Sequence, residues 1–182
     1  MSRVIVKQTP NGITILANKG QNDGGCPFSI NLQNNLELTV PVNGAITFSN
    51  LVYPAPAFIG LEPSCPKVFE TLPPFNNQLE AITAVVIKCA GSYTANVKGK
   101  ITIPVEQQGE LKVAIAVNGV VNSQTITTAD PVTGEVVIPA TLLNLAIGDQ
   151  ITFVNVSENP ITLPAIPNVP NASITVTKIN NI

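Results

Sequence analysis

Histidine and tryptophan are both absent from this sequence of 182 residues. Without histidine the chain lacks the commonest general base and the commonest metal ligand, so most familiar catalytic arrangements have no counterpart here. No serine stands in a Gly-x-Ser-x-Gly motif, no Gly-rich loop opens a helix, and the 11 carboxylates form no recognisable acid–base pair. We therefore expect no enzyme activity, no bound cofactor and no metal.

Charge is also scarce, because charged residues make up 11% of the chain, against about a quarter in a typical soluble domain. The net charge is −2 and no basic stripe occurs, so nucleic acid is not an expected partner. No run of about 18 apolar residues is present, so no membrane helix is expected. Two explanations of the low charge stay open: large buried contacts between subunits, or a Thr/Asn/Gln-rich surface that is soluble without charge.

Cysteine is limited to Cys26, Cys65 and Cys89, an odd number with no zinc-like spacing. Three small buried side chains would account for them, and so would a disulfide within or between subunits. We take Cys26 and Cys65 as candidates for a disulfide between neighbouring subunits. Cys89 ends a strand that indicates core, and we expect it to stay a thiol.

What the sequence does contain is a train of short Val-, Ile- and Thr-rich runs, spaced by turn residues every ten or so positions. This pattern predicts an all-β fold, an antiparallel jelly-roll β-sandwich. Hairpins are expected at Asn43-Gly44, between 36–42 and 45–53, and at Asn118-Gly119, within 110–127. The final run, ASITVTKINNI, is expected in the middle of a sheet. Six prolines place residues 54–76 on a surface crossing or an edge.

The stretch LLNLAIGDQITFVNV, residues 142–156, contains a Gly-Asp pair just before an alternating run. Gly148 permits a tight corner, and Asp149 can accept bonds from nearby amides, so a strand should begin after it with Ile151 and Phe153 facing inward. Asp149 could instead bind calcium with turn carbonyls, but turn capping is favoured. The tripeptides NVS at 155–157 and NAS at 171–173 match the glycosylation acceptor pattern.

The N-terminal part is predicted to be separable: residues 1–25 form an arm and connector, and residues 26–182 form the jelly-roll domain. Two β-rich runs flank the turn at 10–12, and a Gly-rich connector, KGQNDGGCP, follows. A lone hairpin is marginal in water, so the arm must pack on its own domain or on a neighbour. We favour the neighbour. The candidate intersubunit contacts are Val4, Ile5, Val6, Ile13, Ile15 and Leu16.

The order of several segments resembles the tumour-necrosis-factor/complement-globular-head family of jelly rolls. These segments are AGSYTANVKGKITI, LKVAIAVNGV, the Gly-Asp stretch above and a closing ASITVTKINNI. The resemblance covers residues 78–182 well, 36–77 loosely and the arm not at all. The family's Gly-x-Tyr strand and L-x-x-G-D-x-I/V strand match Gly91, Tyr93, Leu145, Gly148, Asp149 and Ile151.

More narrowly, the chain resembles the bacterial branch found on endospores, which includes exosporium basal-layer proteins, heads of collagen-like exosporium glycoproteins and appendage subunits. This resemblance implies a structural surface protein that self-assembles into a homo-oligomer or filament, with other spore-surface proteins as further partners. The N-terminus is then expected to lack a signal peptide, because such proteins are made inside the mother cell. The alternative is a receptor-binding or decoration head of a virus.

Overall fold

The computed structural model describes residues 4–9, 12–17, 29–53, 68–74, 81–101 and 109–179; for the first two ranges and Tyr53 it describes the backbone alone. Every strand pairing within these ranges is antiparallel. The helical structure among them is one short 3-10 turn, η3 (Ser123–Thr125). The all-β prediction is therefore confirmed.

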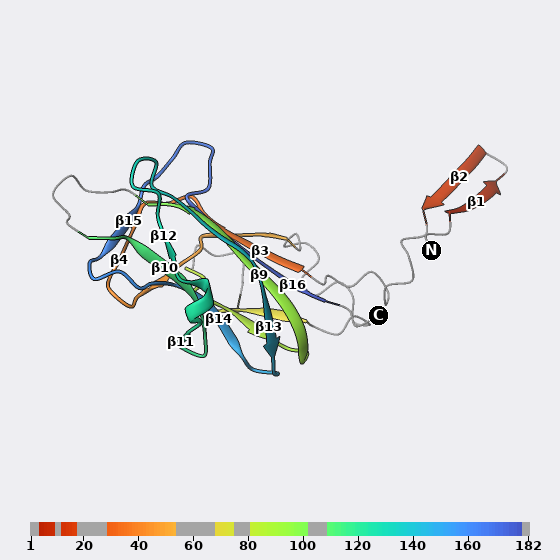
Figure 1. Cartoon of the computed structure of the whole chain (residues 1–182). Coiled ribbons are helices and arrows are strands. Elements are labelled where there is room, and N and C mark those ends of the chain that lie inside the picture. Colours follow the sequence, from red (N-terminus) through yellow and green to blue (C-terminus); the bar gives the residue numbers. More distant parts are fainter. Residues whose placement is uncertain are drawn as a thin grey trace.

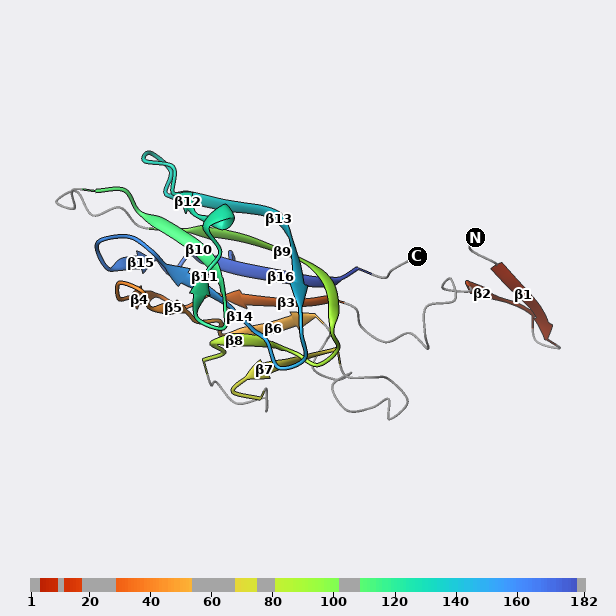
Figure 2. The same ribbon diagram turned by 60° about the horizontal axis from the view of Figure 1, so that its bottom comes forward.

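One layer of the sandwich is a five-stranded sheet with the strand order β13-β9-β16-β3-β6 (Figures 1 and 2). The strands are β13 (Glu135–Leu145), β9 (Gly91–Lys100), β16 (Ala172–Lys178), β3 (Ser29–Asn34) and β6 (Asn50–Tyr53). The last strand of the chain, β16, lies in the centre, between β9 and β3. This confirms its predicted position.

The other layer is built on the path β11-β10-β14-β8-β7, with β12 beside β10 and β5 beside β14. Its strands are β11 (Val120–Val121), β10 (Lys112–Val117), β14 (Gln150–Asn155), β8 (Ala84–Ile87), β7 (Phe69–Leu72), β12 (Thr127–Thr128) and β5 (Ala45–Ile46). The described part of the Pro-rich stretch contains β7, which lies at an edge as predicted. A small pair, β4 (Leu38–Val40) and β15 (Ile161–Leu163), stands apart from both layers in its pairing.

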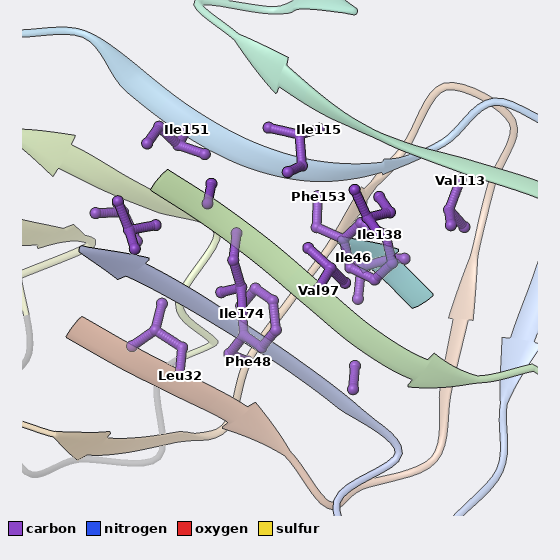
Figure 3. Packing of buried hydrophobic residues seen from close by; sticks show 14 of the residues in the cluster. Leu32, Ile46, Phe48, Val97, Val113, Ile115, Ile138, Ile151, Phe153 and Ile174 are labelled. Atoms are coloured by element: carbon purple, nitrogen blue, oxygen red, sulfur yellow. The ribbon is translucent and has the colours of Figure 1, made fainter. Parts of the chain in front are cut away.

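The core fills the space between the layers, where alternate residues of each strand point inward (Figure 3). Ile151 and Phe153 of β14 are buried, as the alternation predicted, and belong to the same core cluster as Val97 and Ile138 of the facing sheet. Figure 3 shows Phe153 beside Val97 and Ile138. Burying apolar side chains of this size stabilises the fold by about 1.5–3 kcal/mol each. This apolar seam holds the two sheets together.

The two Asn-Gly turns have different outcomes. Asn118 (φ 52°) and Gly119 (φ 77°) both adopt the left-handed region and join β10 to β11 as a hairpin, as predicted. Asn43 (φ 60°) and Gly44 also form a turn, but the expected hairpin around it is wrong. β4 pairs with β15 and β5 pairs with β14, so the turn passes the chain from one sheet to another.

Candidate interaction surface

The Gly-Asp corner before β14 is a capped turn. The backbone N–H of Ala146 donates to Asp149 Oδ2 (2.7 Å), and the side-chain amide of Asn118 donates to Asp149 Oδ1 (2.8 Å). The bond from Asn118, followed by that from Ala146, lowers the pKa of Asp149 below its usual value. Gly148 takes a φ of 93°, which favours glycine. One carboxylate oxygen of Asp149 thus caps the turn, as favoured from the sequence, and the other links this turn to the Asn118-Gly119 turn.

Other carboxylates in the described part of the chain also have structural partners. Asp130 accepts from the backbone N–H groups of Val132 (2.9 Å) and Thr133 (2.7 Å), and these bonds lower its pKa. Glu70 pairs with Lys88 at 2.7 Å. Among the residues that the structure describes, no three His, Cys, Asp or Glu side chains group as a metal site would require. No helix in those same ranges has the length and apolar character to cross a membrane.

The two asparagines of the glycosylation-like tripeptides are both completely buried. The Asn155 amide donates to backbone carbonyls that include Asn159 O (2.9 Å), and the Asn171 amide donates to Leu36 O (2.7 Å) and Pro164 O (2.8 Å). A glycan needs an exposed asparagine, so neither residue can carry one in the folded state. Their role is to tie loops to strands.

At the centre of the five-stranded sheet, on β3 and β16, the outward-facing side chains are polar and uncharged. Ser29 of β3 lies beside Thr177 of β16 with their hydroxyls 2.9 Å apart, and the Asn31 amide donates to the Thr175 hydroxyl (2.6 Å). All four of these side chains are half-buried. This face fits the neutral polar surface that was one of the two explanations of the low charge.

The arm contains the predicted hairpin. β1 (Val4–Thr9) pairs antiparallel with β2 (Gly12–Ala17), which places Ile5 opposite Leu16, Val6 opposite Ile15, and Ile13 opposite Gln8. The candidate apolar residues of the two strands are therefore largely paired with each other. β1 and β2 make a two-stranded sheet, and neither of its outer edges has a partner among the described strands.

The cysteine predictions fall mostly outside the described residues, since Cys26 and Cys65 both lie there. Cys89 is half-buried and packs against the core. Its backbone carbonyl accepts a hydrogen bond from the hydroxyl of Tyr93, a fully buried residue of β9. The ring of Tyr93 packs edge-on against that of Phe69, with 5.8 Å between the ring centroids. Burial and, to a smaller extent, the neighbouring Cys89 raise the pKa of Tyr93 to about 12.

Sequence reasoning missed the exposed apolar residues along and beside β13. Val137 and Leu142 of this edge strand are 52% and 61% exposed, and Ile147 in the following turn is 68% exposed. The available signal was the absence of charge: residues 136–145, VVIPATLLNL, contain no Asp, Glu, Lys or Arg. Edge strands commonly carry charges that prevent pairing with other chains, so a charge-free edge indicates a contact surface.

Comparison with known proteins supplies the fold relationship alone. No protein-family model and no curated protein sequence matches the chain. Among solved structures, murine APRIL is similar with a TM-score of 0.50 and 12% identity, over 83% of this chain and 98% of that one. Rabbit GITRL is similar with a TM-score of 0.40 and 12% identity, over 57% of this chain and 76% of that one. The chain thus has a jelly-roll fold like that of tumour-necrosis-factor family proteins.

Proposed function

We propose that this chain is a structural subunit that assembles with copies of itself through its N-terminal hairpin. The observation that carries the proposal is that β1 and β2 pair only with each other among the described strands. The hairpin is rich in Val, Ile and Leu, and a two-stranded ribbon of this kind is marginal in water. Packing on a neighbouring subunit would bury it.

The composition of the chain supports a structural role. It has no histidine, and the carboxylates Glu70, Asp130 and Asp149 are engaged in an ion pair or in turn caps. A head-to-tail contact between an arm and the next domain generates an open filament when the rotation between subunits does not close a ring. Such a subunit needs no cofactor.

The proposed setting is the surface of a bacterial endospore, in an appendage or in the exosporium layer, where other spore-surface proteins would be further partners. The resemblance to the bacterial jelly-roll branch supports this setting, and the low charge fits a chain that contacts copies of itself. Negative-stain electron microscopy of the purified protein separates this role from a viral head: filaments or sheets fit the proposal, and discrete trimers fit the alternative.

Deletion of residues 1–25 is the direct test. We expect residues 26–182 to remain a folded jelly roll, because β3 is the first strand of the sandwich and β1 and β2 pair with none of its described strands. The truncated chain should stay monomeric where the full chain assembles. Sedimentation velocity measures the assembly, and thermal unfolding followed by circular dichroism checks the fold. An unchanged assembly would show that the arm is not the connector. Loss of cooperative unfolding would place the arm in the domain's own core.

A further inference from the structure

β13 is an edge strand of unusual length for this molecule, and we propose that its open side accepts one strand of the β1–β2 hairpin from a second copy of the chain. The inference rests on the proposed self-assembly and names the surface that receives the arm. In Figure 2, β13 runs along the border of the five-stranded sheet, and only β9 pairs with it among the described strands.

The direction of the backbone groups near the start of β13 follows from two hydrogen bonds on its neighbour. The N–H of Ile101 donates to Gly134 O (2.8 Å), whereas the N–H of Lys100 donates to Asn171 O (2.8 Å) on the opposite side, next to β16. Successive residues of an antiparallel strand alternate in this way. Val136, opposite Gly99, therefore bonds to β9, and Val137 directs its N–H and C=O away from the sheet.

The second half of β13 repeats the pattern beyond an irregularity. The register shifts between Ile138 and Thr141, which is where Pro139 lies, and pairing with β9 then continues to the end of the strand. Leu143 lies opposite Tyr93 in a position that bonds to β9, so Leu142 and Asn144 direct their backbone groups to the open side. The edge thus offers two short pairing segments, one on each side of Pro139.

The other sheet edges are less suited to receive a strand. β6 and β7 have 4 residues each and β11 has 2, whereas β13 has 11 and each strand of the hairpin has 6. Exposed apolar side chains at Val137 and Leu142 flank the open backbone groups, so an added strand would gain apolar contact together with main-chain hydrogen bonds. Within residues 136–145, Pro139 and the register shift are the features that would hinder another strand from pairing with β13.

A second copy is the occupant that the arrangement favours. The hairpin lies outside its own sandwich in both views, with its two edges unpaired among the described strands (Figures 1 and 2). Residues 18–28, between β2 and β3, can span at most about 40 Å. This reach exceeds the length of β9, about 33 Å at the usual rise per residue, so the arm can extend beyond its own domain. Each subunit would then donate one hairpin and accept another.

Two full-length variants separate the donor from the acceptor. Val6→Pro/Ile15→Pro interrupts both strands of the hairpin at paired positions, because proline lacks the N–H that a ladder needs. Val137→Lys/Leu142→Lys places charges along the open edge at exposed positions, where folding should tolerate them. Val120→Lys is the matched control, since Val120 is 72% exposed on the edge strand of the other sheet. Circular dichroism melting verifies each fold, and Leu142→Lys alone replaces the double variant if that one does not unfold cooperatively.

We expect each double variant alone to be monomeric in sedimentation velocity, and an equal mixture of the two to form 1:1 dimers that grow no further. In the mixture, the Val137→Lys/Leu142→Lys protein (the edge variant) supplies an intact hairpin. The Val6→Pro/Ile15→Pro protein (the hairpin variant) supplies an intact β13 edge. The Val120→Lys control should assemble like the unmodified chain. Assembly of the edge variant with loss of assembly in the hairpin variant would overturn β13 as acceptor and leave the proposed function standing. Assembly of both variants, or a monomeric unmodified chain, would overturn the proposed function itself. Monomers in the mixture would overturn the pairing of hairpin with edge.

Discussion

Asn155 shows how a single buried amide can organise several segments at once. Its side-chain NH₂ group lies within hydrogen-bond distance of the carbonyls of Pro41 (3.1 Å), Val40 (3.3 Å) and Asn159 (2.9 Å), and its Oδ1 accepts from the backbone N–H of Ser157 (2.9 Å). Its own backbone bonds to the turn at residues 43–44. One residue at the end of β14 thus fixes the chain where it passes between sheets.

Asn155→Ala should lower the free energy of unfolding by about 2–4 kcal/mol, because it strands several buried carbonyls without a donor. Asn35→Ala is the matched control: Asn35 is exposed, so its effect should stay within about 0.5 kcal/mol. Urea denaturation of the two variants and the unmodified chain measures both values. Equal stability of the Asn155→Ala protein would mean that water or a shifted loop replaces the amide.

Tyr93 provides a pH-dependent signature of the core. Its pKa is raised from 10 to about 12, mainly by burial, so the folded state favours the neutral phenol. The stabilisation is fully present below pH 10 and is lost as the pH rises from 10 to about 12, because the unfolded chain releases this proton first. Ultraviolet titration should show Tyr93 ionising in a late step, well above pH 10. Tyr93→Phe should abolish this late step, and a Tyr93-dependent step near pH 10 would contradict the burial argument.

The corner at Gly148-Asp149 could be predicted from sequence, whereas the role of Asn155 could not. The Asp149 cap to Ala146 spans three residues, so the local pattern contains everything that it needs. The partners of Asn155 include carbonyls more than a hundred positions away in the chain. Its sequence context suggested a glycosylation acceptor instead, since a tripeptide pattern carries no information on burial.

At the scale of elements, turn chemistry predicts that the chain reverses but not which strands then pair. Asn43-Gly44 and Asn118-Gly119 are the same dipeptide, and both are turns with a positive φ at asparagine. After Asn118-Gly119 the strands continue side by side. Around Asn43-Gly44, the flanking strands have only two or three residues, and each finds a longer-range partner, β14 or β15. β5 joins the seven-stranded sheet, whereas β4 forms a separate two-stranded sheet with β15, so the turn alone does not decide which strands pair.

The sequence predicted the central position of β16 but not the edge position of β13, because an edge depends on how the whole sheet assembles. β16 was placed correctly because its dense Val, Ile and Thr content suits a strand with neighbours on both sides. β13 has a similar composition and lies at the border of the same sheet. Its Pro139 is the local signal of an edge, since proline is confined to edges and bulges within sheets. Which edge is left open is a property of the assembled sandwich.

At the scale of the whole molecule, many weak signals in the right order predicted the fold better than any one motif. The succession of runs and turns gave an antiparallel sandwich, and the likeness to murine APRIL in structure, at 12% identity, confirms a jelly roll. The quaternary arrangement depends on surfaces that alternation does not describe. The neutral polar face around Thr175 and the apolar border at Leu142 became visible only with the sheets assembled.

The last prediction concerns disulfides between subunits. If the arm reaches a neighbour and Cys26 of one subunit bonds to Cys65 of the next, non-reducing gels of the assembled protein should show a ladder of multimers. Cys26→Ser and Cys65→Ser should each reduce the ladder to monomers, and an equal mixture of the two should yield dimers only, because one bond of the pair can still form. Cys89→Ser should leave the ladder unchanged, since this residue packs against the core beside Tyr93. Monomers alone from the unmodified chain after boiling without reductant would rule out the crosslink, and a monomer whose mobility changes on reduction would place the disulfide within one chain.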